Sequence, residues 1–132
     1  MKKRRLAAVL CLLVMTLSGC GQSLPEGMDK KEVTEAGEHV AELLGTGESD
    51  AVYDLFREDV AQQLSSEDVA ALVPQSAGAW KEIAASEAIG RTDEDSGEEY
   101  ALVMVICEFE EGRVTISAAF DQEMELIGVQ VG

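Results

Sequence analysis

The hydrophobic pattern of this 132-residue chain changes its period once, near Gly90. Before Gly90, apolar residues recur every three or four positions, a spacing that places them on one face of a helix. After an acidic stretch they form strand-length runs separated by turn residues. Helices followed by an antiparallel meander are the order of an α+β domain. We therefore expect N-terminal helices packed on an antiparallel sheet of about four strands.

Two amphipathic helices are expected first. One covers residues 29–44, with an apolar face made of Val33, Gly37, Val40, Ala41 and Leu44. The glycines in Gly45-Thr46-Gly47 end it. A second helix, capped by Ser49 or Asp50, carries an apolar stripe made of Val52, Leu55, Phe56, Val60 and Leu64.

Shorter helical segments follow. Ser65, three residues before Asp68, resembles a capping box and predicts a third, short helix through Leu72. Pro74 ends this helix because proline does not continue a helical ladder. A last helical piece is expected over residues 77–85, where Trp80, Ile83 and Ala84 supply the apolar positions.

The C-terminal half predicts the sheet. A short strand over residues 86–91 precedes the acidic, glycine-containing loop 92–99. Residues 100–109 are apolar at consecutive positions, as expected of a central strand. Residues 113–121 alternate between two faces, and residues 126–131 form the last strand.

The N-terminus carries a separate signal. Four cations at positions 2–5 precede an apolar run over residues 6–17, which is too short to span a bilayer, where roughly 20 residues are needed. The run ends in Leu17-Ser18-Gly19-Cys20, which resembles the lipobox of bacterial lipoproteins. That resemblance implies cleavage before Cys20, a lipid thioether on Cys20, and attachment to the extracytoplasmic face of the cell membrane. A short N-terminal anchor with an incidental cysteine is the alternative.

The leader sets the expected domain layout. Residues 1–19 are the signal peptide, 20–28 a lipidated tether, and 29–132 a single α+β domain. The seven residues 21–27 correspond to an end-to-end distance of about 15 Å if they behave as a flexible chain. The domain is therefore expected close to the membrane surface.

The charge balance excludes two classes of partner. All 26 acidic residues lie after Cys20, against six of the ten lysines and arginines, so residues 21–132 carry a formal charge of −20. Such a surface repels nucleic acids and anionic lipid headgroups. We expect membrane attachment through the lipid alone. The acidity serves solubility, or it attracts a basic protein partner or loosely held cations.

Cysteine usage adds one expectation. With Cys11 in the leader and Cys20 lipidated, Cys107 is left alone and cannot form an internal disulfide. It ends the apolar run 101–107, so we expect a buried structural thiol and not a nucleophile.

Several short motifs together resemble domain of unknown function 3887, a family of small domains in lipoproteins of Gram-positive bacteria. They are Leu55-Phe56, the run Leu64–Asp68, Trp80, Val105–Phe109, Val114–Ser117, Phe120-Asp121 and Leu126–Val131. The resemblance covers about residues 31–132. It implies a cystatin-like or nuclear transport factor two-like cone, with helices packed into a curved antiparallel sheet. It implies no activity, and the Gly-x-Ser-x-Gly elbow of hydrolases joined to some members is absent from this sequence.

Two acidic clusters are candidates for metal sites. His39 has Glu35 and Glu42 within one helical turn, but three ligands on one exposed helix form an incomplete cage, so a solvated face is expected. The second cluster comprises Asp93, Glu94, Asp95, Glu98 and Glu99. It lacks the ligand spacing of a calcium loop, and we expect an exposed, mobile loop. Neither a metal nor another cofactor is predicted.

A cone of this kind often encloses a cavity. The candidate lining residues are Trp80, Tyr100, Met104 and Phe120, and the alternative is a filled core. No acidic residue interrupts an apolar face in a way that suggests a general base. Thr115 and Ser117 lack an evident histidine or lysine partner.

Together these features predict a membrane-anchored lipoprotein with a non-catalytic binding or interaction domain. The alternative is a small-molecule binder or lyase-type enzyme that uses the cone cavity. The expected partners are a basic protein or a small ligand, besides the membrane. Whether the open face of the sheet forms a homodimer is left open.

Overall fold

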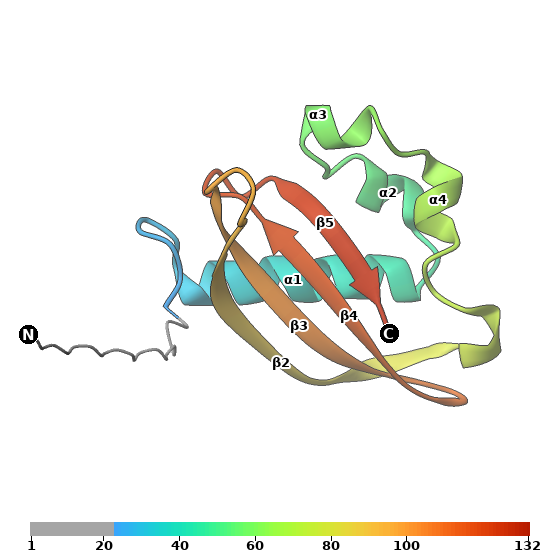
Figure 1. Ribbon diagram of the computed structural model, residues 1–132. Coiled ribbons are helices and arrows are strands. Elements are labelled where there is room, and N and C mark those ends of the chain that lie inside the picture. Colours follow the sequence, from blue (N-terminus) through green and yellow to red (C-terminus); the bar gives the residue numbers. More distant parts are fainter. Residues whose placement is uncertain (1–22) are drawn as a thin grey trace, which may run out of the picture.

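The computed structural model describes residues 23–132, so the predicted signal peptide and Cys20 lie outside the described residues. Four antiparallel strands form one sheet in the order β2-β3-β4-β5. They are β2 (Trp80–Thr92), β3 (Glu99–Phe109), β4 (Gly112–Phe120) and β5 (Leu126–Val131). The long helix α1 (Lys30–Gly45) crosses one face of the curved sheet, behind it in Figure 1. The expected α+β fold is therefore confirmed.

Helix α1 forms where its sequence predicts. Asp29 caps it by accepting a hydrogen bond from the Glu32 N–H at 3.0 Å. Its buried residues are Val33, Gly37, Val40, Ala41 and Leu44, which is the predicted apolar face. Because these residues recur at helical spacing, one stripe of α1 packs on the sheet and the charged face remains in solvent.

The core lies between α1 and the sheet. Alternate residues of β3 face the helix and are fully or almost fully buried: Ala101, Val103, Val105, Cys107 and Phe109. Ile116 and Ala118 of β4 lie beside Val105 and Val103 in the antiparallel register. Within residues 23–132, no helix lies over the opposite face of the sheet (Figure 1).

The second predicted helix is wrong in its extent. The chain forms α2 (Ser49–Tyr53) and α3 (Glu58–Ala61), with a non-helical segment between them. In that segment Phe56 forms a parallel bridge with Leu126 of β5. The Arg57 N–H donates to the Leu126 carbonyl at 2.8 Å, so pairing with a distant strand replaces the local helical hydrogen bonds.

The third helix is confirmed, with a shorter span. Helix α4 (Ser66–Ala70) has the predicted capping box, because the Ser65 side chain accepts from the Asp68 N–H and the Asp68 side chain accepts from the Ser65 N–H. A 3-10 turn, η2 (Gln75–Ala77), follows Pro74. In Figure 1, α2, α3 and α4 lie together beyond the β5 edge of the sheet.

The helical piece predicted over residues 77–85 is wrong, because β2 begins at Trp80. Register shifts between Trp80 and Glu82 and between Ile83 and Ala85 insert extra residues into the strand. These bulges place Trp80, Ile83 and Ser86 three residues apart on the less exposed face. Two bulges therefore give this strand the three-residue spacing of apolar positions that is typical of a helix.

The remaining strands lie close to their predicted bounds, and the strand expected at 86–91 is the end of β2. Residues expected in the tether contact the domain: Pro25 is buried, and Leu24 and Met28 pack against the core. Residues 23–28, which are predicted to belong to a flexible tether, therefore lie against the domain. Among residues 23–132, no helix has the length and hydrophobicity needed to cross a bilayer.

Candidate functional site

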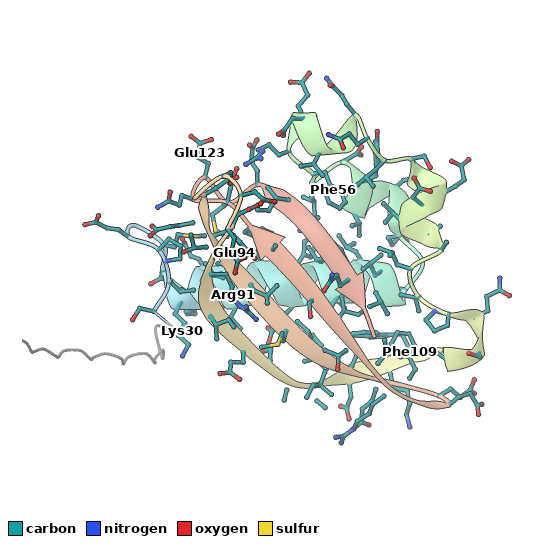
Figure 2. The ribbon with its side chains drawn as sticks, in the orientation of Figure 1. Lys30, Phe56, Arg91, Glu94, Phe109 and Glu123 are labelled. Atoms are coloured by element: carbon teal, nitrogen blue, oxygen red, sulfur yellow. The ribbon has the colours of Figure 1, made fainter. Side chains whose placement is uncertain are left out.

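The uncovered face of the sheet is partly apolar. Residues of β3 that point away from α1 are half-buried: Tyr100, Leu102, Met104 and Ile106. At one end a hollow of about 560 Å³ is lined by Tyr100, Leu102 and Ser117 together with Arg91, Asp93 and Glu98. Figure 2 labels Arg91 at this end of the sheet and Glu94 in the acidic loop above it. The hollow combines an apolar floor with charges of both signs at its rim.

The four predicted lining residues do not form one cavity. Trp80 and Phe120 lie on the α1 side, where Trp80 meets Phe109 edge-to-face with ring centroids 5.5 Å apart. Tyr100 and Met104 lie on the uncovered face, because neighbouring residues of a strand point to opposite sides. Of the four, only Tyr100 lines the hollow on the uncovered face.

Arg57 connects three separate segments. Its guanidinium bonds Asp59 at 2.7 Å, Glu98 of the acidic loop at 2.7 Å, and Asp121 at 3.1 Å. Hydrogen bonds from Arg57 to Asp59, then to Glu98 and Asp121, raise the pKa of Arg57 above its ordinary value. Arg57 in turn lowers the pKa of the Asp59 carboxyl. This junction joins the α2–α3 segment to both turns at one end of the sheet.

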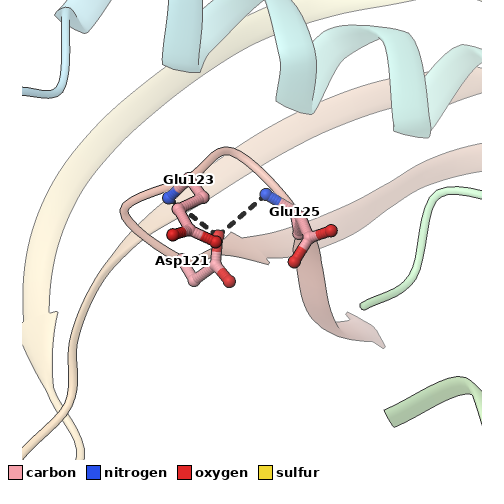
Figure 3. A group of neighbouring side chains, drawn as sticks. All are labelled: Asp121, Glu123 and Glu125. Atoms are coloured by element: carbon pink, nitrogen blue, oxygen red, sulfur yellow. Dashed lines mark hydrogen bonds between the residues drawn. The ribbon is translucent and has the colours of Figure 1, made fainter. Parts of the chain in front are cut away.

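Asp121 is the one buried charged residue of the described chain, with 5% of its surface exposed. One carboxylate oxygen accepts from the N–H groups of Glu123 and Glu125, both at 2.9 Å, as Figure 3 shows. Its other oxygen binds Arg57. Both oxygens are therefore used in holding the β4–β5 turn, where Met124 has φ of 67°.

The same turn contains a group with the spacing of metal ligands. Carboxylate oxygens of Asp121, Glu123 and Glu125 lie within 4.8 Å of one another. Glu123 and Glu125 are exposed, and Asp121 is already engaged with Arg57. The sequence prediction missed this group, although acidic residues at every second position from 121 to 125 are a signal that could have revealed it.

The two acidic clusters considered as metal sites from the sequence do not form ligand cages among the described residues. His39, Glu35 and Glu42 are exposed on α1, the solvated face that was expected. In the acidic loop Asp93 accepts from the N–H groups of Asp95 and Ser96, at 2.8 and 3.3 Å. Its carboxylate thereby stabilises a turn, as aspartate side chains commonly do.

Cys107 is fully buried, as predicted. Burial in apolar surroundings raises the pKa of its thiol to about 11. A thiol that stays protonated and inaccessible at neutral pH is a poor nucleophile. Its role is packing between α1 and the sheet.

Comparison with known proteins agrees with this fold. The sequence model of the family described as "Protein of unknown function (DUF3887)" matches residues 37–129, which include the C-terminal half of α1, the short helices and nearly all of the sheet. The chain belongs to the DUF3887 family. The predicted family is thus confirmed, while the predicted signal peptide lies outside the residues that the family model matches.

One solved structure resembles this DUF3887 domain. It is described as an NMR structure of a protein from Ruminococcus gnavus ATCC 29149, with a TM-score of 0.68 and 24% sequence identity. The match covers 83% of this chain and 96% of the other. At this identity the likeness establishes the fold alone. No curated protein sequence matches the chain.

Proposed function

We propose that this protein is a lipid-anchored lipoprotein on the extracytoplasmic face of the cell membrane, whose α+β domain binds a partner without catalysing a reaction. The anchor rests on the sequence: cations, a short apolar run and small residues precede Cys20. The binding role rests on how the domain is packed.

The observation that carries the proposal is the filled space between α1 and the sheet. A Cβ atom added to Gly37 would overlap the Val103 side chain, and one added to Gly45 would overlap the Trp80 ring. Val33, Val40, Val103 and Val105 are fully buried in this layer. Close contact at both glycines supports a solid core in place of the substrate cavity that the enzymatic alternative requires.

The buried carboxylate supports the same conclusion. A general base needs a free oxygen facing a substrate. Asp121 instead has one oxygen on two backbone N–H groups and the other on Arg57. Asp121 therefore stabilises the β4–β5 turn.

Metabolic labelling with a fatty-acid analogue tests the anchor. We expect label on the wild-type protein and none on Cys20→Ala, which should also remain as uncleaved precursor. Cys107→Ala is the matched control and should keep the label, because Cys107 lies inside the domain core. Label on Cys20→Ala would contradict the proposed anchor.

Crosslinking of the membrane-bound protein, followed by affinity purification, tests the binding role. A basic protein recovered reproducibly, and lost when the salt concentration is raised, is the expected result for a domain with a formal charge of −20. Recovery of a bound metabolite alone would contradict it. A small ligand would then be expected in the hollow beside Arg91 and Tyr100, and not in the cone.

A further inference from the structure

The two edges of the sheet differ in their protection. The β2 edge strand carries four charged side chains, at Lys81, Glu82, Glu87 and Arg91, and the Ser23 backbone lies against Gly90. The other edge strand, β5, contains no charged residue and no proline. Charges, prolines and covering segments are the usual means of keeping an edge strand from pairing. Along residues 128–131, β5 has neither a charge nor a proline, and within residues 23–132 no segment forms hydrogen bonds with its outward edge.

The hydrogen-bond pattern shows which backbone groups β5 presents outward. Thr115 and Gly132 exchange two hydrogen bonds, at 2.9 and 3.0 Å. Bonded and non-bonded pairs alternate in an antiparallel ladder, so Gln130 is also turned toward β4. Val129 and Val131 therefore direct their N–H and C=O groups away from the sheet. Within residues 23–132, no hydrogen bond reaches these four groups.

The beginning of the same edge already accepts an added backbone segment. The Leu126 N–H donates to the Leu55 carbonyl at 3.2 Å, and the Leu126 carbonyl accepts from the Arg57 N–H at 2.8 Å. This parallel bridge extends no further, because the chain turns into α3 at Glu58. The segment 55–57 thus covers the first position of the edge and leaves Val129 and Val131 for another strand.

An apolar groove of about 220 Å³ runs beside this edge. Its walls come from the short helices and from β5, and include Val60, Leu64, Val69, Leu72, Ile127 and Val129. Phe56, labelled in Figure 2, also lines it. A strand added to β5 would point every second side chain to this side of the sheet. The groove thus supplies an apolar pocket next to unpaired backbone groups, the combination that strand-addition sites use.

The charges around the groove indicate which kind of segment binds at this edge. Asp68 lines the groove, and the exposed carboxylates of Glu58, Asp59 and Glu67 lie on the same short helices. The nearest cation of these helices, Arg57, is already bound by three carboxylates. Pairing with a second copy would bring together two domains that each have a formal charge of −20. A basic segment is attracted where a second copy is repelled.

We propose that β5 is a docking edge for an extended segment of a partner protein, in which apolar residues alternate with lysine or arginine. The segment adds to the sheet beside Val129 and Val131, and its apolar side chains enter the groove next to Leu64 and Leu72. This names the binding surface of the interaction domain proposed above, and so rests on that function.

Fluorescence anisotropy with a synthetic probe tests the proposal on the full-length protein in detergent micelles. The probe is a labelled peptide of about eight residues, a usual strand length, with alternating valine and lysine. The control peptide has the same sequence with N-methyl groups on alternate backbone nitrogens, which keeps its charge and removes the strand hydrogen bonds. At about 0.15 M salt we expect the control to bind at least roughly tenfold more weakly, as expected when about 1.4 kcal/mol of binding energy is lost.

Variants locate the site. Val129→Pro removes an outward N–H, and Leu64→Glu places a charge in the groove; each is expected to weaken probe binding about tenfold, a loss of about 1.4 kcal/mol. Leu55→Glu is the matched control and should bind normally, because Leu55 is exposed and lies outside the groove. Amide chemical shifts of the wild-type protein give a second measurement that needs no variant, with changes expected over residues 127–131 and at Leu64 and Leu72.

Three results would overturn the proposal. Equal binding of the two peptides would show attraction by charge alone. Shift changes over residues 91–102 with none over residues 60–72 would place the site in the hollow of the uncovered face. A dimer that Val129→Pro dissociates would show that the edge pairs with a second copy. None of these results depends on fatty-acid labelling. The lipid anchor and the docking edge are therefore tested independently, and either proposal can be wrong without the other.

Discussion

The main contribution of Arg57 to this fold is the positive charge that it places beside the buried carboxylate of Asp121. Asp121 is buried where the β4–β5 turn meets the helical segment, and a buried carboxylate without a counter-charge is costly. Arg57 supplies that charge while also binding Glu98 in the neighbouring loop. One side chain therefore fixes two turns and the start of α3 relative to one another.

Replacing Arg57 with methionine is expected to lower the free energy of unfolding by about 1–3 kcal/mol, because Asp121 keeps only its backbone donors. Urea unfolding measures the loss. Arg113→Met is the matched control: the Arg113–Glu108 pair is largely exposed and should cost less than about 0.5 kcal/mol. Equal losses for the two variants would show that the buried position of Asp121 is unimportant.

Because the Cys107 thiol is buried, we expect the folded protein to lose stability at alkaline pH. Its pKa is raised by burial from 9.0 to about 11, so above pH 9 the unfolded chain loses a proton that the folded chain retains. The stabilisation from keeping the thiol neutral is complete below pH 9. The free energy of unfolding therefore falls as pH rises from 9 to about 11.

Unfolding at several pH values, compared between wild type and Cys107→Ala, isolates this contribution. The wild type should lose about 2–3 kcal/mol more than the variant across that interval, since each pKa unit corresponds to about 1.4 kcal/mol. Every other side chain is common to the two proteins, so its contribution cancels in the difference. Parallel curves would show that burial does not raise the pKa of the thiol in the folded chain.

At the scale of elements, α1 could be predicted from sequence because one regular helix carries its own apolar stripe and its own cap at Asp29. β2 could not, because its two bulges give Trp80, Ile83 and Ser86 a spacing that belongs to helices. The break between α2 and α3 depends on pairing with Leu126, about seventy residues away along the chain. Local pattern carries no information about such a partner.

The same distinction applies to the candidate site. Tyr100 and Met104 are apolar enough to predict as lining residues, but the side of the sheet on which each lies depends on strand register. The Arg57 junction joins positions 57, 98 and 121, and no sequence motif links them. The unprotected β5 edge is visible in sequence as six uncharged residues, but the groove beside it follows from the placement of the short helices.

The contact between α1 and β3 can be tested as a pair. Gly37→Ala is expected to destabilise the domain by about 1–3 kcal/mol, because its new Cβ overlaps Val103, although alanine favours helices by about 1 kcal/mol. Val103→Ala alone should also destabilise, by leaving a cavity. In the double variant the methyl group added at position 37 finds space, so the combined loss should be smaller than the sum of the two.

A double-mutant cycle from urea unfolding gives the coupling. We expect about 1 kcal/mol or more in favour of the double variant. His39→Ala, on the exposed face of the same helix, serves as the control and should be additive with Val103→Ala. Additivity of Gly37→Ala with Val103→Ala would show that the helix and sheet do not meet closely at this point.

At the scale of the whole molecule, the dominant feature is charge. The described domain contains all 26 acidic residues and six lysines and arginines, and Arg57 and Arg113 are held in ion pairs with carboxylates. An excess of one sign opposes compaction through self-repulsion. The packed layer between α1 and the sheet must therefore offset repulsion as well as chain entropy, and the proposed basic partner would relieve part of it.

Salt should consequently stabilise this protein. Raising NaCl from about 0.01 M to about 0.15 M shortens the screening length from about 30 Å to about 8 Å, and we expect Tm to rise by several degrees. Tetramethylammonium chloride should give the same rise, because screening depends on ionic strength and not on a cation site. A variant with Glu26, Glu35, Glu42 and Glu48 replaced by glutamine, all exposed and outside the ion pairs, should show a shallower dependence. Differential scanning calorimetry measures both slopes; a Tm that is insensitive to salt, or that responds to sodium alone, would contradict long-range repulsion as the cause.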